Sequence, residues 1–315
     1  MYDSYSKGIS YGKGLLILIG LWFGGLLLGG VLSIPVWLLM TGRGLATMTE
    51  DMMLPQYVNA LRVIQVVSTL VTFFLPAFFT ALILSRRPFK LMGFTAPATY
   101  RQFLLSIAII FCGAIIAGAL SELNEMIPLS KKAADFFTKM EESYSRQVEA
   151  ITSIKNFRDY IVSLFMIALL PAIFEETFFR GGMQNLLTRS SKNPWLAILI
   201  TSFIFSIIHL SYYGFLARVC LGIVLGLLYY YSGSLWLSIT AHFFNNAFAV
   251  TQMYILIQKG KSVKEAMNDS LPLWWGAIAI AVIYFLFVWY KKIAIEVKRK
   301  YTSPEDKALE EKWIA

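Results

Sequence analysis

The sequence predicts an all-α, polytopic membrane protein with about eight transmembrane helices in one intramembrane bundle. Of its 315 residues, 57% are hydrophobic and only 15% are charged, and the mean hydropathy is +0.62. Typical soluble domains carry about 25% charged residues. Apolar runs of about 17 or more residues recur along the whole chain, which is long enough for a helix to cross a bilayer. The alternating pattern of outer-membrane β-strands is absent.

The net charge of +9 does not indicate nucleic-acid binding. The basic residues cluster at the ends of apolar runs, where the positive-inside rule and anionic lipids favour them. The expected surroundings are therefore membrane lipid, with no nucleic-acid partner. Cys112 and Cys220 both lie within apolar runs, so they predict no disulfide framework.

The ends of the predicted spans follow the apolar runs and the turn residues between them. In chain order the spans cover about residues 14–40, 63–84, 103–120, 160–187, 194–210, 215–231, 235–257 and 273–290. The pairs Gly24-Gly25 and Gly29-Gly30 in the first span predict close helix packing or a bend. Serine and glycine at 232–234 predict a tight turn before the seventh span.

The basic clusters after the second, fourth and eighth spans predict that both termini lie in the cytoplasm. The segment 121–157 would then lie outside, although its Lys and Arg residues count against that orientation. Its charged residues alternate with Phe136, Phe137, Met140 and Tyr144. This pattern predicts an amphipathic helix on the membrane or over the bundle. The same helix could alternatively be a lid. Residues 1–315 show no repeat and no separate soluble domain.

The fourth predicted span contains three charged residues: Glu175, Glu176 and Arg180. Each costs about 2.5–3.5 kcal/mol at the centre of a membrane helix, so intramembrane charges indicate a functional site. Glu176 and Arg180 are four residues apart with the acid first, which predicts a structural ion pair on one helix face. Glu175 is turned by about 100° from Glu176 and is free to point elsewhere.

The only two histidines, His209 and His242, also lie in predicted membrane helices, and Asn246 follows His242 by one turn on the same face. One histidine on an apolar helix is usually a packing residue, but two beside a glutamate pair predict a polar site. Glu175 and His209 both lie roughly 22–24 Å from their shared turn, so they can face each other. His242 lies about two helical turns away from that level unless its helix tilts or the preceding turn is recessed.

These side chains predict a hydrolase that cleaves a peptide bond at the membrane. Glu175 can take a proton from a water that His209 orients. His242 and Asn246 can donate hydrogen bonds to a developing oxyanion. An alternative chemistry uses Glu175, His209 and His242 as zinc ligands with one position open for water.

Two other function classes remain open. A non-enzymatic immunity or scaffold protein could share this fold. A proton-coupled transporter could also use intramembrane Glu and His, although repeat symmetry and broken helices in matching halves are absent.

Three motifs in order resemble those of the CPBP family: Glu175-Glu176-x-x-x-Arg180-Gly181, Phe205-x-x-x-His209 and His242-x-x-x-Asn246. This family groups type II CAAX prenyl endopeptidases with bacteriocin-processing and bacteriocin-immunity (Abi) proteins. The resemblance covers about residues 171–250 and implies an eight-helix intramembrane bundle with its catalytic core at 158–257.

The resemblance also implies roles for the site residues. Glu175 would be the water-activating carboxylate with His209 as its partner. His242 and Asn246 would stabilise the oxyanion, and Glu176 and Arg180 would form the structural pair. Both metal-dependent and metal-free mechanisms are argued for the family. We expect the metal-free form, with no cofactor, because Asn246 suits hydrogen bonding better than ligation.

The expected substrate is a membrane-associated peptide or protein, and the expected location is a bacterial cell membrane.

Overall fold

The computed structural model describes residues 5–151, 154–260 and 272–301, and these form helices joined by short links, with no strand among them. The prediction of an all-α polytopic bundle is confirmed. In chain order the elements are α1 (Tyr11–Thr41), α2 (Met48–Asp51), η1 (Pro55–Tyr57), α3 (Val58–Thr69), η2 (Leu70–Phe74), α4 (Leu75–Leu84), α5 (Pro88–Met92), α6 (Tyr100–Glu125), α7 (Lys131–Ile151), α8 (Phe157–Ser163), η3 (Leu164–Leu169), α9 (Leu170–Glu176), η4 (Thr177–Gln184), α10 (Asn185–Ser191), α11 (Pro194–Ile207), α12 (Phe215–Ser232), α13 (Leu235–Gln258) and α15 (Leu273–Tyr301).

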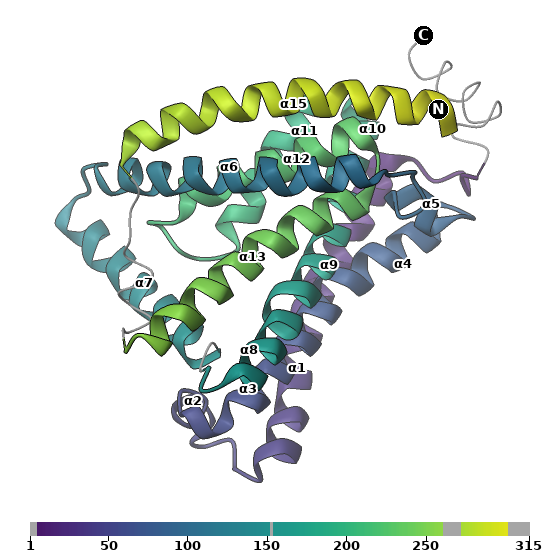
Figure 1. The fold of residues 1–315 in the computed structure, drawn as a ribbon. Helices are drawn as coiled ribbons and strands as arrows, with labels where there is room; N and C mark the ends of the chain where they lie inside the picture. The colour runs from purple at the N-terminus through teal and green to yellow at the C-terminus, as the bar shows by residue number, and fades with distance from the viewer. Residues whose placement is uncertain (1–4, 152–153, 261–271, 302–315) are drawn as a thin grey trace.

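The helices pack in two groups around one central rod. On one side α6 and α15 lie side by side and pack with α12 (Figure 1). On the other side α1 packs along α3, η2 and α4. The central rod is the continuous run from α8 to α10. Its segments contact α1 and α4 on one side and α11, α12 and α13 on the other. The charged motif of the fourth predicted span therefore lies in the middle of the bundle.

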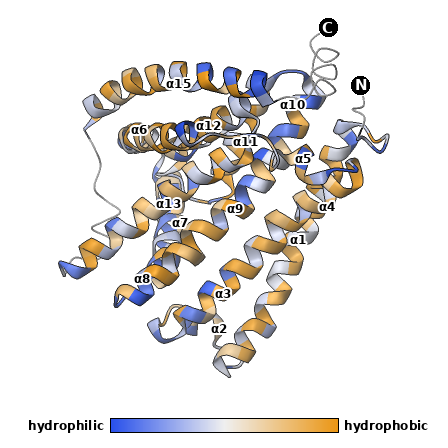
Figure 2. Ribbon diagram, turned by 45° about the vertical axis from the view of Figure 1, so that its right-hand side comes forward, coloured by the Kyte–Doolittle hydropathy of each residue, from blue (hydrophilic) through white to orange (hydrophobic). Residues whose placement is uncertain are grey.

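Six of these helical runs are long and apolar enough to cross a membrane within the described residues. Hydrophobic colour covers most of α1 and α4, and hydrophilic colour gathers near the C-terminal end of α15 (Figure 2). The predicted fifth and seventh spans, α11 and α13, are not among these six. α11 has only 14 residues, because the chain turns at His209. α13 has 24 residues, but the polar side chains that it directs into the bundle lower its hydropathy.

Two π-helical segments lie directly before prolines in continuous helical runs. A proline lacks the backbone N–H, and its ring clashes with the carbonyl four residues earlier. For Pro76 that residue is Thr72 in η2, and for Pro171 it is Ile167 in η3. The wider π turn moves this carbonyl away from the ring, so the helix continues past the proline.

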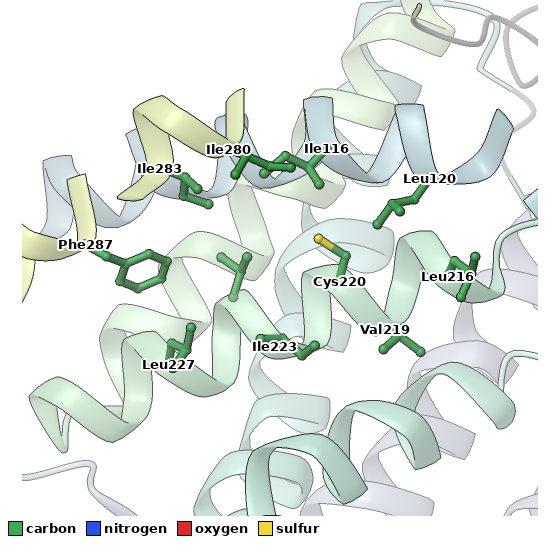
Figure 3. A pocket seen from close by; sticks show the side chains of 11 residues that line it. Ile116, Leu120, Leu216, Val219, Cys220, Ile223, Leu227, Ile280, Ile283 and Phe287 are labelled. Carbon is green, nitrogen blue, oxygen red and sulfur yellow. The ribbon is translucent and has the colours of Figure 1, made fainter. Parts of the chain in front are cut away.

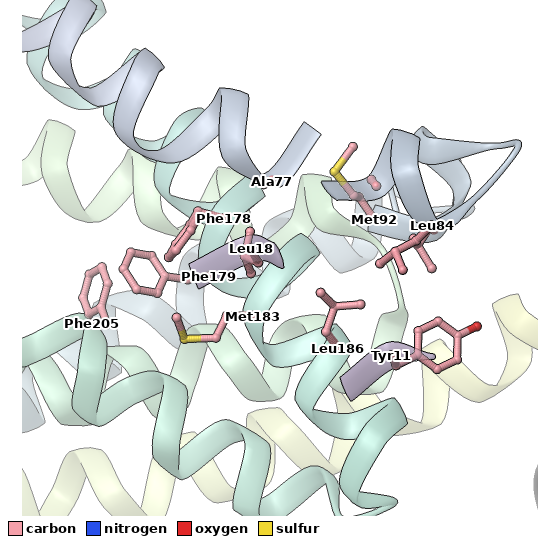
Figure 4. Packing of buried hydrophobic residues seen from close by; sticks show 12 residues of the cluster. Tyr11, Leu18, Ala77, Leu84, Met92, Phe178, Phe179, Met183, Leu186 and Phe205 are labelled. Atoms are coloured by element: carbon pink, nitrogen blue, oxygen red, sulfur yellow. The ribbon is translucent and has the colours of Figure 1, made fainter. Parts of the chain in front are cut away.

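A cluster of buried apolar and aromatic side chains joins α1, α4, the link to α6 and the central rod (Figure 4). Phe178 and Phe179 lie at its centre and are fully buried, with their ring centroids 5.1 Å apart. Phe179 also meets Phe205 of α11 edge to face at 5.1 Å. This cluster packs α11, which ends just before His209, against the rod that carries the charged motif.

The paired glycines of α1 mark close packing, one of the two outcomes predicted for them. A Cβ at Gly25 would lie 2.5 Å from the backbone oxygen of Val71, and one at Gly29 would lie 3.3 Å from Oγ1 of Thr72. The neighbouring Gly24 faces open space. α1 and η2 therefore approach as closely as two backbones allow, as in small-residue contacts between membrane helices.

Candidate active site

The fully buried Glu176 carboxylate links three elements. Its Oε1 accepts hydrogen bonds from Nη1 of Arg180 at 2.6 Å and from Nδ1 of His242 at 2.8 Å. Glu176 and Arg180 both have an exposed side-chain fraction of 0%. The predicted i,i+4 pair is therefore present, although its arginine lies in a π turn. The carboxylate also holds the imidazole of α13, a contact that helical spacing within one segment cannot reveal.

Arg180 attaches the central rod to α12 as well. Its Nη2 donates to the carbonyl of Gly222 at 3.1 Å, and one turn later Nε2 of Gln184 donates to the carbonyl of Gly226 at 2.9 Å. The guanidinium lies 5.1 Å from the ring centroid of Phe205. Glycine is needed on α12 because a Cβ at Gly226 would lie 2.9 Å from Oε1 of Gln184. The π turns of η4 thus direct two polar side chains at one face of α12.

Glu175 lies beside the other ring nitrogen of His242. Its Oε2 is 3.9 Å from Nε2 of His242, and 12% of its side chain is exposed, in contrast to the fully buried Glu176. The two carboxylates therefore differ in role. Oε1 of Glu176 accepts from two donors, whereas Glu175 keeps a small exposed fraction beside Nε2 of His242.

The predicted mismatch in level between His242 and the glutamates is absent, since Nδ1 of His242 lies 2.8 Å from Oε1 of Glu176. Ser232 and Ser234 are buried, and the N–H of Leu235 donates to the carbonyl of Gly93 at 3.0 Å. Gly93 has φ +90°, and a Cβ there would lie 2.5 Å from the oxygen of Gly233. The turn at 232–234 is thus held inside the bundle by the α5–α6 link.

His209 lies in the turn after α11. Its Nδ1 is 2.7 Å from the carbonyl of Phe205, so Nδ1 carries the proton and Nε2 of the neutral ring is left as an acceptor. Leu210 follows with φ 51°, an uncommon conformation for a branched residue that recurs at functional sites. The rings of His209 and His242 both pack on Phe205, with centroid distances of 4.9 Å and 5.9 Å. No hydrogen bond joins His209 to Glu175 within the described residues.

Asn246 follows His242 by one turn on α13 and is partly buried. Its Oδ1 accepts from Nδ2 of Asn245 at 3.4 Å. Its own NH₂ group donates no hydrogen bond within the part of the chain that the structure describes. Because His242 and Asn246 share a helix face, this amide is free to donate on the side where Nε2 of His242 lies.

The zinc alternative uses Glu175, His209 and His242 as ligands. Among residues 5–151, 154–260 and 272–301, no group of three His, Cys, Asp or Glu side chains is placed to hold a metal ion. Nδ1 of His242 is bonded to Glu176, and Nδ1 of His209 is bonded to a backbone carbonyl. These bonds leave Nε2 of both imidazoles available, as in histidines that ligate zinc, so the metal-free form stays a prediction, and no metal step is derived below.

The amphipathic helix α7 lies against the turn that carries His209. Glu141 accepts from the Ser211 hydroxyl at 2.8 Å, and the ring of Phe137 stacks on Tyr212 with a centroid distance of 4.2 Å. The Tyr144 ring lies 5.6 Å from the guanidinium carbon of Arg218. Burial raises the pKa of the Tyr144 hydroxyl, the Arg218 guanidinium opposes this, and the carboxylates of Glu141 and Glu175 add to the rise. α7 therefore covers the site from outside the bundle.

The fold and the site together define a helical membrane protein with a buried carboxylate–histidine–arginine network. Residues 157–248 match a family model described as type II CAAX prenyl endopeptidase, Rce1-like. This part of the chain is similar to the CAAX protease family, and the resemblance of the three motifs is confirmed. At family level the match supports a membrane-embedded endopeptidase. No curated protein and no solved structure matches the chain.

Proposed function

We propose that this protein is an intramembrane endopeptidase that hydrolyses a peptide bond of a membrane-associated peptide or protein without a metal. The observation that supports the proposal is that two adjacent carboxylates have different surroundings. Glu176 is saturated at Oε1 by Arg180 and His242, whereas Glu175 lies partly exposed beside Nε2 of His242. A neighbouring acid that is already paired leaves the second acid available as a base.

In the first step Glu175 takes a proton from a water molecule that attacks the peptide carbonyl. His209 orients this water, because its Nδ1 is occupied by the Phe205 carbonyl and its Nε2 accepts an O–H. A positioned base contributes about 10²–10⁴-fold to the rate of such a reaction. The attack forms a tetrahedral oxyanion on the former carbonyl carbon.

The oxyanion then accepts hydrogen bonds from α13. Asn246 donates from its free NH₂ group. His242 donates from Nε2, and because Nδ1 also donates to Glu176, the ring holds two protons in this role. The Glu176 carboxylate balances the positive charge of the ring, while Glu175 holds the proton that it took from the water. As the tetrahedral species collapses, protonated Glu175 returns its proton to the leaving amine.

The test compares purified wild-type protein with Glu175→Gln on fluorogenic peptides, prenylated and plain, with product masses assigned. The matched control is Glu142→Gln, the same change at an exposed position of α7. We expect cleavage by wild type and control and none by Glu175→Gln at unchanged thermal stability. Equal cleavage by Glu175→Gln would remove this residue from the mechanism. Loss of cleavage with a chelator, restored by zinc, would contradict the metal-free assignment.

A further inference from the structure

A second site lies on the far side of α12 from the carboxylates. It is an apolar pocket of about 410 Å³ between α6, α12 and α15 (Figure 3). The carbonyls of Gly222 and Gly226 face the central rod, whereas Val219, Ile223 and Leu227 line the pocket. The full lining is Ile116, Leu120, Leu216, Val219, Cys220, Ile223, Val224, Leu227, Ile280, Ile283 and Phe287.

The chemistry of the lining selects a hydrocarbon occupant. Apart from the thiol of Cys220, every lining side chain is aliphatic or aromatic. Water in such a cavity finds no hydrogen-bond partners, and apolar cavities stay dry or take apolar ligands. The volume falls within the range of about 300–1,000 Å³ that is usual for small-ligand pockets. All three lining helices are candidate membrane spans, and Ile280 at the rim is 57% exposed, so the pocket adjoins the hydrocarbon of the bilayer.

A cation lies one helical turn beyond one end of the pocket. Leu227 and Phe287 form that end in Figure 3. Four residues further along α12 is Tyr231, and four residues further along α15 is Lys291. The Lys291 ammonium lies 5.6 Å from the ring centroid of Tyr231, whose ring is 6.3 Å from that of Phe287. An exposed positive charge is thus fixed by an aromatic ring at the mouth of an apolar pocket.

We propose that the pocket binds one acyl chain of an anionic phospholipid whose phosphate pairs with Lys291. The positive-inside rule assigns this end of the bundle to the cytoplasmic side, where anionic lipids attract basic residues close to the membrane surface. The apolar pocket would hold the acyl chain, and Lys291 at its end would meet the phosphate of the headgroup. The site is separate from the carboxylates, so the inference does not depend on the proteolytic activity.

The experiment uses the full chain in neutral detergent with phosphatidylglycerol that carries a photoreactive group in one acyl chain. The same probe with a phosphatidylcholine head is the lipid control. We expect cross-links to the lining residues of α6, α12 or α15, and stronger labelling by the anionic lipid that decreases with added salt. Equal labelling by both lipids, or cross-links spread over the outer surface, would overturn the proposal.

Three variants separate the two parts of the site. Lys291→Gln should weaken phosphatidylglycerol binding about fivefold and leave phosphatidylcholine binding unchanged. The matched control is Lys300→Gln, because Lys300 also lies over an aromatic ring, at 5.3 Å from that of Tyr301. Cys220→Phe should abolish labelling of the pocket with either lipid at an unchanged circular dichroism spectrum. An effect of Lys300→Gln equal to that of Lys291→Gln would refute the headgroup assignment.

Discussion

Replacing Arg180 by methionine removes the cation from a pair whose two side chains are fully buried. Glu176 would keep its bond from His242 but lose the one at 2.6 Å, and the Gly222 carbonyl would lose its donor on the central rod. Breaking a buried pair by removing one partner costs about 3–5 kcal/mol, because the remaining charge stays in a medium of low dielectric. We expect the free energy of unfolding of Arg180→Met to fall by that amount.

The second half of this prediction concerns the double variant Glu176→Gln/Arg180→Met. The amide oxygen of glutamine still accepts from His242, but no charge remains that needs a partner. Replacing both members of a buried ion pair by uncharged groups is often close to neutral. The double variant should therefore be more stable than Arg180→Met alone.

The assay is reversible unfolding in mixed micelles with increasing denaturing detergent, followed by far-UV circular dichroism. Arg146→Met, at an exposed position of α7, is the matched control and should change stability by less than about 0.5 kcal/mol. A loss below about 1 kcal/mol for Arg180→Met, or a double variant no more stable than the single one, would refute the account of a buried, charge-balanced pair.

Three further outcomes follow from local geometry. Gly25→Ala should lower the free energy of unfolding by about 1–3 kcal/mol, because its Cβ meets the η2 backbone. Gly24→Ala faces open space and should raise it by up to about 1 kcal/mol. Unfolding of both variants in detergent measures the two values. Asn246→Ala should lower kcat about 10²–10³-fold with little change in KM, as steady-state cleavage would measure. Phe137→Ala should speed amide hydrogen exchange along α7 by removing the stack on Tyr212, whereas Phe136→Ala, at a site 59% exposed, should not.

The parts of the site that were predictable from the sequence are those that lie within one helix. The spacing of Glu176 and Arg180 predicted their pairing, and the structure has it at 2.6 Å. The spacing of His242 and Asn246 predicted a shared face. Such pairs depend only on helix geometry, which the local sequence determines.

The parts of the site that could not be predicted depend on how separate helices pack against one another. Counting residues from a surface turn placed His242 about two turns away from the glutamates, because nothing local shows that the 232–234 turn is buried. Gly93, with its left-handed φ, was the available signal, since a glycine there allows two backbones to touch. The contact of Arg180 with Gly222 escaped for the same reason, although glycines on an apolar helix do indicate close approach.

The fifth predicted span ends earlier than expected for a related physical reason. α11 looked long enough to span a bilayer because the residues beyond Ile207 remain apolar. The chain nevertheless turns there, with His209 bonded back to Phe205 and Leu210 in a left-handed conformation. Hydropathy indicates which segments can lie in lipid, but it does not show where the backbone changes direction.

The π segment η3, which lies before Pro171, has a consequence for the direction of the two glutamates. Each residue of an α-helix turns the following side chains by about 100°, and a π turn contains an extra residue. If η3 closed into ordinary α turns with no residue removed, the residues after it would turn by about 100°, and Glu175 and Glu176 would rotate together away from α13. The angular phase of the candidate active site is therefore set about two turns upstream, by residues that contact neither histidine.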